Sequence, residues 1–331
     1  MPLDWSPLVE LVRRHQTFLL MTHVRPDADG MGSQLGLADA LTRMGKTAHV
    51  VIASPLPPRY RFLDPDRTII ENFEAPGTKY RNVDAILVLD TGTWNQLGEF
   101  GDFMKGMTVP KAVVDHHRTQ DDLGGLAFVD ITAEATGRLA YEIIRVLGAP
   151  LSPAAANHLF MALATDTGWF RHANTSAATF ELAGELVKAG ANPTPLYERL
   201  YEAAPLARLK LTGVALERLQ TRANGRIAYT EVKLADYAAT GAVPGDTEEL
   251  INHPRSIDGV DLAMIFIEQS DGGTKVSFRS RSADVSKLAE QFQGGGHKLA
   301  SGARLPDALA IAREKVIAAA EKLLQDEAAR G

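Results

Sequence analysis

Three short apolar runs in the first half of the chain are each followed, within two residues, by ionisable side chains. His23, Asp90 and the triplet Asp115-His116-His117 follow these runs. Runs that are apolar throughout are typical of strands buried on both faces of a parallel sheet. Ligands of such sheets bind at the carboxyl ends of the strands. We therefore expect these side chains to meet at one edge of a sheet.

The first 190 residues alternate between strand-like and helix-like patterns. Strands are predicted at 18–21, 48–52, 85–89, 112–114 and 126–129, and helices at 31–44, 134–147, 154–165 and 177–189. This alternation predicts an α/β fold, a mostly parallel sheet with helices on both faces. Residues 1–190 are the first predicted domain.

A helix stop and turn residues at 190–195 end this pattern. Residues 191–218 are predicted to form a helical linker. Residues 219–331 are predicted to form a smaller α+β domain, with a cleft between the two domains. In that domain we expect strands at 226–232, 261–268 and 275–281, helices at 285–292 and 308–328, and a hairpin turn at Asp271-Gly272-Gly273.

The amino-acid composition argues against several classes of function. The formal net charge of −6 argues against a protein that coats long nucleic acid, which needs a basic excess. The absence of cysteine excludes disulfides, thiol nucleophiles and cysteine zinc sites. Because no apolar run reaches the length of a membrane span, a cytoplasmic protein without a membrane partner is expected.

Four clusters carry groups that can bind metal. The loop after the first run holds His23, Asp27 and Asp29, and Asp90 lies before a Thr-Gly turn. The other two clusters are Asp115-His116-His117 and Asp166, at the end of a predicted helix. A carboxylate at a helix C-terminus opposes the helix dipole unless a cation compensates it. Turn and capping roles remain alternatives for Asp27, Asp29 and Asp90, as does an exposed polar loop for the triplet.

Two imidazoles and four carboxylates suit two octahedral divalent ions that share one carboxylate. Such a pair can hold the attacking and leaving oxygens of a phosphoryl group. The mixed set without thiolate fits Mn²⁺ better than structural Zn²⁺. The candidate ligands are His23, Asp27, Asp29, Asp90, His116 and Asp166.

The four motifs, in this order, resemble those of the DHH phosphoesterase superfamily. A fifth stretch, Gly294-Gly-Gly-His297 with its continuation to Gly302, resembles the signature of the DHH-associated C-terminal domain, although Gln293 stands where members often have a fourth glycine. The chain is similar to the NrnA-type members, which combine oligoribonuclease and 3′-phosphoadenosine-5′-phosphate phosphatase activity.

The resemblance implies roles for individual residues. His23, Asp27 and Asp90 would hold one Mn²⁺, and Asp29, Asp90, His116 and Asp166 the other, with Mg²⁺ or Co²⁺ as substitutes. Asp90 would bridge the ions. Asp115 would support the two histidines, and His117 would face the scissile phosphate or leaving group as a catalytic residue beside Asp90 and Asp115.

A second group of residues is suited to holding an anionic substrate. Strand alternation predicts Arg279 and Arg281 on one strand face, where they form a phosphate fork or a solvated surface. A glycine run can present successive N–H groups to an anion or be an ordinary turn. The predicted substrate residues are Arg171, Arg279, Arg281, Gly294, Gly295, Gly296 and His297.

The predicted activity is two-metal hydrolysis of short RNA oligonucleotides to mononucleotides, and of an adenine bisphosphate nucleotide to AMP. Alternatives that use the same core are a phosphodiesterase acting on cyclic or linear dinucleotides (c-di-AMP or pApA), a RecJ-like single-strand exonuclease and a manganese pyrophosphatase. A nucleotide sensor module is the non-enzymatic alternative. The resemblance is compatible with a homodimer, and long duplex nucleic acid is not an expected partner.

Overall fold

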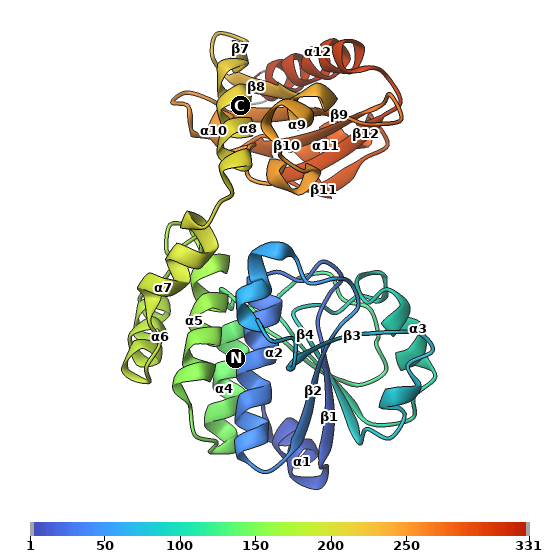
Figure 1. Cartoon of the computed structure of the whole chain (residues 1–331), viewed down its shortest axis with the longest axis vertical. Coiled ribbons are helices and arrows are strands. Elements are labelled where there is room, and N and C mark those ends of the chain that lie inside the picture. Colours follow the sequence, from blue (N-terminus) through green and yellow to red (C-terminus); the bar gives the residue numbers. More distant parts are fainter. Residues whose placement is uncertain (1–2, 329–331) are drawn as a thin grey trace. The chain divides into compact units, whose positions relative to one another are not determined.

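The computed structural model describes residues 3–328 of the chain. The chain divides into two compact units, Met1–Ala203 and Ala204–Gly331, each with its own hydrophobic core. Figure 1 shows the elements of each unit. In each unit, the arrangement of the sheet and its helices explains where the polar residues lie together.

A six-stranded parallel sheet forms the centre of unit 1, in the order β3-β2-β1-β4-β5-β6. The strands are β1 (Thr17–Met21), β2 (Thr47–Ile52), β3 (Ile70–Asn72), β4 (Ala85–Leu89), β5 (Lys111–Asp115) and β6 (Leu126–Val129). The prediction of a mostly parallel sheet is confirmed. The prediction missed β3, because three residues at a sheet edge are too short for a periodic signal.

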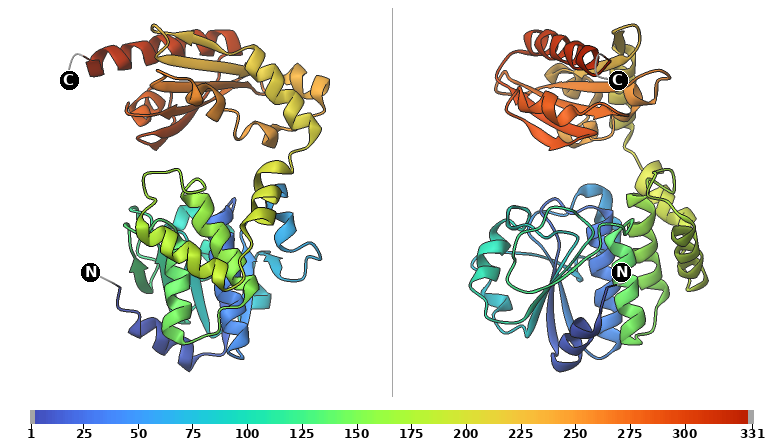
Figure 2. Two further views of the ribbon diagram at one scale, coloured as in Figure 1. Left: turned by 90° about the vertical axis from the view of Figure 1, so that its left-hand side faces the viewer. Right: turned by 180° about the vertical axis from the view of Figure 1, so that it is seen from behind.

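Helices cover both faces of this sheet, as predicted. Helices α2, α4 and α5 pack on one face, and α3 lies on the other (Figures 1 and 2). The helices of unit 1 are α1 (Ser6–Arg14), α2 (Ala28–Arg43), α3 (Glu99–Lys105), α4 (Thr136–Leu147), α5 (Pro153–Asp166), α6 (Ala177–Lys188) and α7 (Pro193–Tyr197). Short 3₁₀ segments lie at η1 (Pro58–Leu63), η2 (Thr78–Tyr80) and η3 (Trp94–Gln96).

The strand order reverses between β1 and β4. From β1 the chain first builds outward to β2 and β3, and then returns to place β4 on the other side of β1. Loops that leave neighbouring strands at such a point diverge to opposite faces and open a crevice at the carboxyl edge. The loop containing His23 and the residue Asp90 follow these two strands, so the topology brings them together.

Helices α2 and α5 pack closely because α2 carries glycine where the two meet. A Cβ on Gly32 would lie 2.4 Å from the carbonyl oxygen of His158, and one on Gly36 would lie 2.8 Å from Leu159. Only a residue without a side chain fits at these distances. This contact holds α2, whose first turn contains Asp29, against α5, whose last residue is Asp166.

The helical linker predicted over residues 191–218 is interrupted in the structure. Helix α7 passes into a π-helical turn, η4 (Glu198–Glu202), and helical structure stops before Pro205. Helix α8 (Leu206–Glu217) then begins in unit 2. Proline disfavours helical geometry in the residue before it, which explains the break.

Unit 2 contains a mixed six-stranded sheet in the order β11-β12-β10-β9-β8-β7, with β8 and β9 parallel and the other neighbours antiparallel. Its strands are β7 (Gln220–Arg222), β8 (Ile227–Val232), β9 (Leu262–Glu268), β10 (Thr274–Ser280), β11 (Gly295–His297) and β12 (Ala300–Leu305). Its further helices are α9 (Leu234–Thr240), η5 (Pro244–Thr247), α10 (Asn252–Ser256), α11 (Val285–Glu290) and α12 (Leu309–Ala328). The predicted α+β character and the hairpin between β9 and β10, with Gly272 at φ 84°, are confirmed.

Helix length and apolar composition decide whether a helix can cross a membrane. None of the helices within residues 3–328 combines the length and the apolar composition that crossing a bilayer requires.

His158 on α5 gives a testable pH dependence of stability. Burial lowers its pKa to about 4, against a smaller opposing effect of Asp39, and its buried Nδ1 has no hydrogen-bond partner within residues 3–328. Because the folded pKa lies below the ordinary 6.5, the unfolded chain takes up a proton between pH 6.5 and 4 that the folded chain does not. Stability is therefore lost as the pH falls through this window.

Between about pH 7.5 and pH 5, the unfolding free energy of the natural chain should fall by about 1–2 kcal/mol more than that of His158→Gln, because the variant lacks this titrating group. Urea denaturation of both proteins at the two pH values measures this difference. Other titrating groups are common to both proteins and cancel in the comparison. Parallel pH profiles for the two proteins would contradict the assignment.

Candidate metal centre

The carboxyl edge of the unit 1 sheet gathers the six predicted ligands from four segments. His23 and Asp27 lie in the loop after β1, and Asp29 is in the first turn of α2. Asp90 directly follows β4, His116 directly follows β5, and Asp166 is the last residue of α5. Residues far apart in the sequence thus share one place in the fold.

A first set consists of His23, Asp27 and Asp90. The Nε2 atom of His23 lies 3.6 Å from Asp27 Oδ1 and 3.5 Å from Asp90 Oδ2. One ligand atom from each of the three lies within 4.8 Å of the others, close enough to share an ion.

A second set consists of Asp29, His116 and Asp166. The Nε2 atom of His116 lies 3.7 Å from Asp29 Oδ2 and 3.3 Å from Asp166 Oδ2. It also lies 3.6 Å from Oδ1 of Asp90. Asp90 therefore turns one carboxylate oxygen toward each set, which is the arrangement that a bridging ligand requires.

The two imidazoles are oriented by their backbone partners. Nδ1 of His23 lies 3.0 Å from the carbonyl oxygen of Val24, and Nδ1 of His116 lies 3.1 Å from that of Ala133. A carbonyl only accepts, so each Nδ1 carries the proton when the ring is neutral. Each Nε2 is then left with a lone pair toward the carboxylates, as in histidines that bind metal.

The start of α4 supports two of the carboxylates. The backbone N–H groups of Thr136 and Gly137 donate to Asp29 at 2.7 and 2.8 Å, and the hydroxyl of Thr136 donates to Asp90 at 2.9 Å. In the structure these donors are engaged by the carboxylates, which they hold in place.

The carboxylates carry more negative charge than their surroundings compensate. Burial, together with Asp90 and Asp166, raises the pKa of Asp29 well above its ordinary value. Burial, together with Asp90 and Asp27, does the same for the pKa of Asp166. Burial would lower the pKa of His23, but its contacts with Asp27 and Asp90 outweigh burial and raise it to about 11. The cluster thus favours added positive charge, and its oxygen and imidazole donors fit divalent cations.

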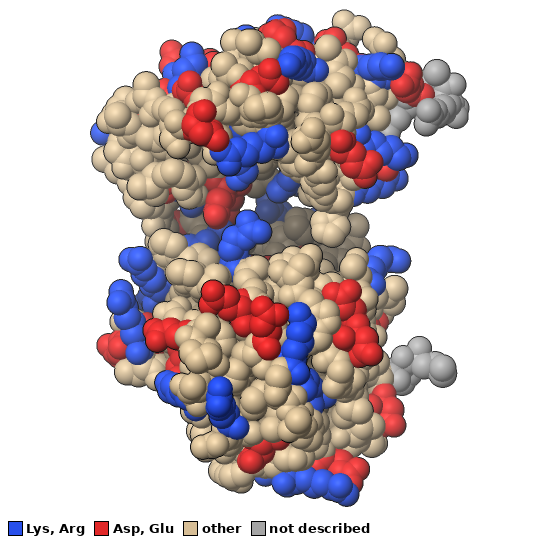
Figure 3. Space-filling view, turned by 90° about the vertical axis from the view of Figure 1, so that its right-hand side faces the viewer, with Lys and Arg blue, Asp and Glu red and all other residues tan. Residues whose placement is uncertain are grey.

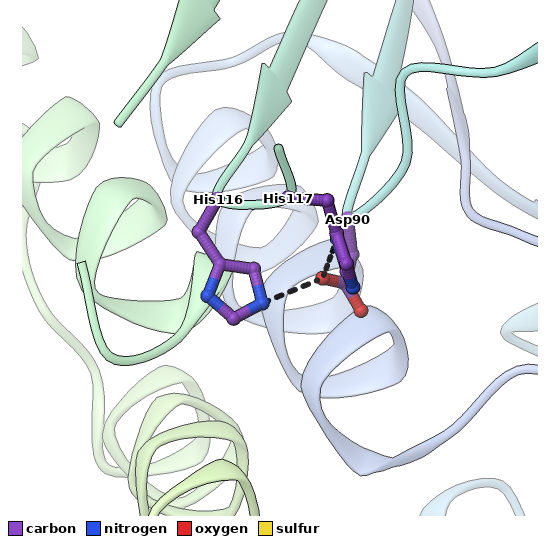
Figure 4. Close-up of side chains that lie close together, drawn as sticks. All are labelled: Asp90, His116 and His117. Atoms are coloured by element: carbon purple, nitrogen blue, oxygen red, sulfur yellow. Dashed lines mark ion pairs between the residues drawn. The ribbon is translucent and has the colours of Figure 1, made fainter. Parts of the chain in front are cut away.

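His117 lies at the rim of the cluster and is held by Asp115. Its Nδ1 is 2.7 Å from Asp115 Oδ1 and 3.8 Å from Asp90 Oδ1, and its side chain is 51% exposed. Figure 4 shows both imidazoles of the pair beside Asp90. The hydrogen bond to Asp115 outweighs burial and raises the pKa of His117 to about 9. His117 therefore holds a proton at neutral pH and presents Nε2 for donation.

Asp115 is itself fixed by several donors. Its Oδ1 accepts the backbone N–H groups of His116 and His117, and Oδ2 accepts the side-chain amide of Gln120 at 2.6 Å. Burial opposes ionisation, but these bonds and His117 lower the pKa of Asp115 overall. Asp115 contacts the ring of His117 only, whereas the ring of His116 bonds to Ala133.

The backbone of Asp90 has an uncommon conformation. Its φ is +64°, in the left-handed region that residues other than glycine rarely adopt. Its N–H still donates to the carbonyl of Val114 on β5 at 3.0 Å. Strain of this kind concentrates at functional sites, where the surrounding structure enforces it.

Arg171 lies close in the chain to Asp166. It follows α5 and is exposed, and its Nε donates to the carbonyl of Gly168 at 2.7 Å.

The predicted substrate residues of unit 2 fall into two groups. Arg279 is half-buried on β10, where Val276 and Phe278 face the core, but Arg281 lies just after the end of β10. The prediction of a strand reaching 281 was therefore one residue too long. Nη2 of Arg281 approaches the carbonyl oxygens of Arg255 and Ile257 at 3.4 Å.

The glycine run contributes to strand β11, and its members differ. A Cβ on Gly294 would lie 2.2 Å from the carbonyl oxygen of Gly302, and one on Gly296, whose φ is 140°, 2.6 Å from that of Ala300. A Cβ on Gly295 would meet nothing within 4 Å. Gly294 and Gly296 thus permit close packing on β12, while Gly295 and His297 are exposed.

Sequence reasoning missed the supporting role of Gln120, which bonds both Asp115 and the carbonyl of His117. No motif marks it, since its position depends on the path of the loop after β5. It also missed Thr22, whose buried hydroxyl lies beside Gly30 and has no hydrogen-bond partner among the residues that the structure describes.

Comparison with known proteins adds the family to this geometry. Residues 17–165 match the DHH family, N-terminal domain, and residues 224–326 match the DHHA1 domain. A protein of Thermus thermophilus, named bifunctional oligoribonuclease and PAP phosphatase NrnA, is 30% identical over 288 residues, which are 86% of this chain and 83% of the relative.

The chain belongs to the DHH family of phosphoesterases. It is accordingly an enzyme of the metal-dependent hydrolase class.

Two further similarities extend over nearly the whole chain. A protein of the same printed name from Bacillus subtilis is 28% identical over 91% of this chain and 93% of the relative. The crystal structure of an exopolyphosphatase-related protein from Bacteroides fragilis has a TM-score of 0.89 at 23% identity, and covers 97% of this chain and 95% of that one. The second similarity concerns the fold alone.

Gly30 allows a direct test of the centre. A Cβ at this position would lie 2.3 Å from the hydroxyl of Thr22 and 3.3 Å from Asp90 Oδ2. We expect Gly30→Ala to displace Asp90 and to weaken Mn²⁺ binding at least about tenfold, the size of effect seen when support of a ligand is lost. Calorimetric titration with Mn²⁺ measures this change.

Gly184→Ala is the matched control, since Gly184 lies inside α6 with open space around it. The control should raise the unfolding free energy by up to about 1 kcal/mol and leave Mn²⁺ affinity unchanged. Equal affinities of Gly30→Ala and the natural chain would show that Gly30 does not protect the ligand geometry.

Proposed function

We propose that the enzyme hydrolyses short oligoribonucleotides to mononucleotides, and the bisphosphate nucleotide 3′-phosphoadenosine-5′-phosphate to AMP, with two Mn²⁺ ions. Mg²⁺ or Co²⁺ would substitute. The observation that carries the proposal is Asp90, whose two carboxylate oxygens each face one set of ligands. Relatives whose alignments cover about nine-tenths of this chain are named oligoribonuclease and PAP phosphatase, which supports this choice of substrates.

His23, Asp27 and Asp90 would hold one ion, and Asp29, Asp90, His116 and Asp166 the other. Bound there, such a pair supplies Lewis-acid activation of water and neutralises charge on the phosphoryl group. The donors of α4 keep Asp29 and Asp90 in place throughout. The site can therefore act without rearranging its own ligands.

His117 is the residue suited to the leaving group. Asp115 accepts the Nδ1 proton of its ring at 2.7 Å, so Nε2 is directed away from Asp115 and can donate a proton to the leaving oxygen. Because Asp115 is in turn fixed by Gln120, the ring has a defined orientation. General-acid assistance of this kind contributes about 10²–10⁴-fold to a rate.

The basic residues bind the substrate phosphates in this proposal. Arg279 and Arg281 of unit 2 take the terminal phosphate together with the exposed residues Gly295 and His297, and Arg171 contacts substrate beside Asp166. Arginine suits this role because its planar fork matches phosphate oxygens. A site that binds one end of the substrate favours short oligonucleotides over long polymers.

The charge distribution agrees with short substrates. On the face drawn in Figure 3, acidic and basic side chains are interspersed. Proteins that coat long nucleic acid instead gather lysine and arginine in a stripe. A few arginines that contact phosphates are sufficient for an oligonucleotide of a few residues.

The activity is tested by a time course with Mn²⁺ on a five-nucleotide RNA, a linear diadenylate and the bisphosphate nucleotide. We expect all three to be hydrolysed and chelator to stop the reactions. Turnover of the bisphosphate alone would reduce the function to that of a nucleotidase. If all three substrates survive, the proposal is wrong, and cyclic dinucleotides, pyrophosphate or sensing without turnover would replace it.

Asp90→Ala should lower the rate by about 10³-fold or more, because it removes the shared ligand. Asp130→Ala is the matched control. Asp130 follows β6 as Asp90 follows β4, but its carboxylate bonds Thr132 and belongs to neither set. Near-normal turnover of Asp90→Ala, measured beside an active control, would rule out the two-ion assignment.

The glycine run provides a separate test of substrate binding by unit 2. Gly295→Ala has room for its Cβ, so the fold should remain while the KM for the bisphosphate rises about fivefold or more, because the added methyl group obstructs the approach of the phosphate to this exposed position. Gly294→Ala should instead lower the unfolding free energy by about 1–3 kcal/mol through overpacking on β12. An unchanged KM for Gly295→Ala would remove the glycine run from the proposed site.

A further inference from the structure

The position of Asp166 depends on the turn that follows it. Its carboxylate is 32% exposed, whereas those of Asp29 and Asp90 are 1% and 2% exposed. Within residues 3–328 the one hydrogen-bonding or ion-pair contact of this carboxylate is with His116. Asp29 and Asp90 are held by donors of α4, but Asp166 has no such donor among the described residues. The orientation of the Asp166 carboxylate therefore depends on the backbone conformation at Asp166 and in the turn that follows it.

That backbone enters a turn of uncommon conformation. Gly168, Trp169 and Phe170 have φ values of 57°, 59° and 64° in succession. Bulky aromatic residues rarely adopt left-handed φ, and they hold it only where surrounding contacts enforce it. The N–H of Trp169 donates to the carbonyl of Ala164 at 2.5 Å, which folds the turn back onto the last turn of α5.

Aromatic rings enclose Trp169. Its ring centroid lies 6.1 Å from that of Phe160 on α5, 5.1 Å from Tyr197 and 5.6 Å from Tyr201, all edge-to-face. Tyr197 and Tyr201 also contact each other at 5.0 Å. Edge-to-face pairs at such distances are favourable and fix the relative orientation of the rings.

The two tyrosines belong to the last segment of unit 1. Tyr197 ends α7, and Tyr201 lies in the π-helical turn η4, after which the chain passes into unit 2 at Ala204. Single π-helical turns are rare and are frequent at functional sites. The rings thus connect the turn after Asp166 to the place where the chain leaves unit 1.

We propose that Trp169 is a positioning residue that fixes the metal ligand Asp166 and couples it, through Tyr197 and Tyr201, to the segment leading into the second unit. The inference rests on the proposed function, because it assumes that Asp166 binds a metal ion. In this inference, the affinity of the second ligand set for Mn²⁺ depends on ring contacts that lie outside the metal centre. A change at η4 is thereby transmitted to Asp166.

The test compares the natural chain with Trp169→Leu, Tyr201→Leu and Trp5→Leu by calorimetric titration with Mn²⁺ and by thermal unfolding. Leucine keeps apolar volume and removes the ring. Trp5 is the matched control, because its ring stacks on Phe128 at 5.2 Å and lies in unit 1, but none of its contacts involves a ligand. The control should lose thermal stability and keep its Mn²⁺ affinity.

We expect Trp169→Leu and Tyr201→Leu each to weaken one of the two Mn²⁺ sites about tenfold, in line with the loss of support for the metal ligand Asp166. The double variant should show a loss smaller than the product of the two, since both residues act through one contact. Turnover should fall through kcat, with the KM for the bisphosphate little changed.

Three outcomes would overturn the inference. In the first, Trp169→Leu lowers the melting temperature as Trp5→Leu does but keeps its Mn²⁺ affinity, which makes the ring structural only. In the second, Trp169→Leu alone weakens Mn²⁺ binding, which removes the coupling through Tyr201. In the third, the effects of the two substitutions multiply, which means that they act independently. Failure of the natural chain to bind Mn²⁺ is a different result, and it refutes the proposed function itself.

Discussion

Mutual repulsion among four carboxylates is the constraint on which the first unit depends. Asp27, Asp29, Asp90 and Asp166 lie within ion-pair distance of two imidazoles, and burial and neighbouring carboxylates raise the pKa values of all but Asp27. Such a group is stable only where donors or cations compensate the charge. The start of α4 supplies donors, and the remaining excess of negative charge favours the binding of divalent cations.

The architecture around the centre can be understood from this constraint. The reversal of strand order places the ends of β1 and β4 side by side, and the glycines of α2 allow α5 to approach closely. Backbone strain at Asp90 and in the turn after Asp166 lies beside the groups that it positions. In unit 2, Gly294 permits close packing of β11 on β12, while Gly295 is exposed and has room for a side chain.

Much of the fold could be predicted from the sequence, for identifiable reasons. Apolar runs fixed the five longer strands of the parallel sheet, because burial on both faces requires apolar residues throughout. The short edge strands β3 and β7 carry no such pattern, and neither does the π-helical turn at η4. Pro205, which interrupts the predicted helical linker, lies within a pattern that is otherwise helical, and a periodic pattern alone does not locate such a break.

The sequence by itself determined which residues could form the centre and which family the chain resembles, because ligand chemistry depends on residue type and motifs are local. Only the tertiary structure decided how these residues are grouped and supported. Which oxygen of Asp90 faces which imidazole, why Thr136 and Gln120 matter, and that Trp169 meets Tyr201 all depend on contacts between segments distant in the chain. Local sequence does not encode those distances, since they arise when the sheet and its helices pack together.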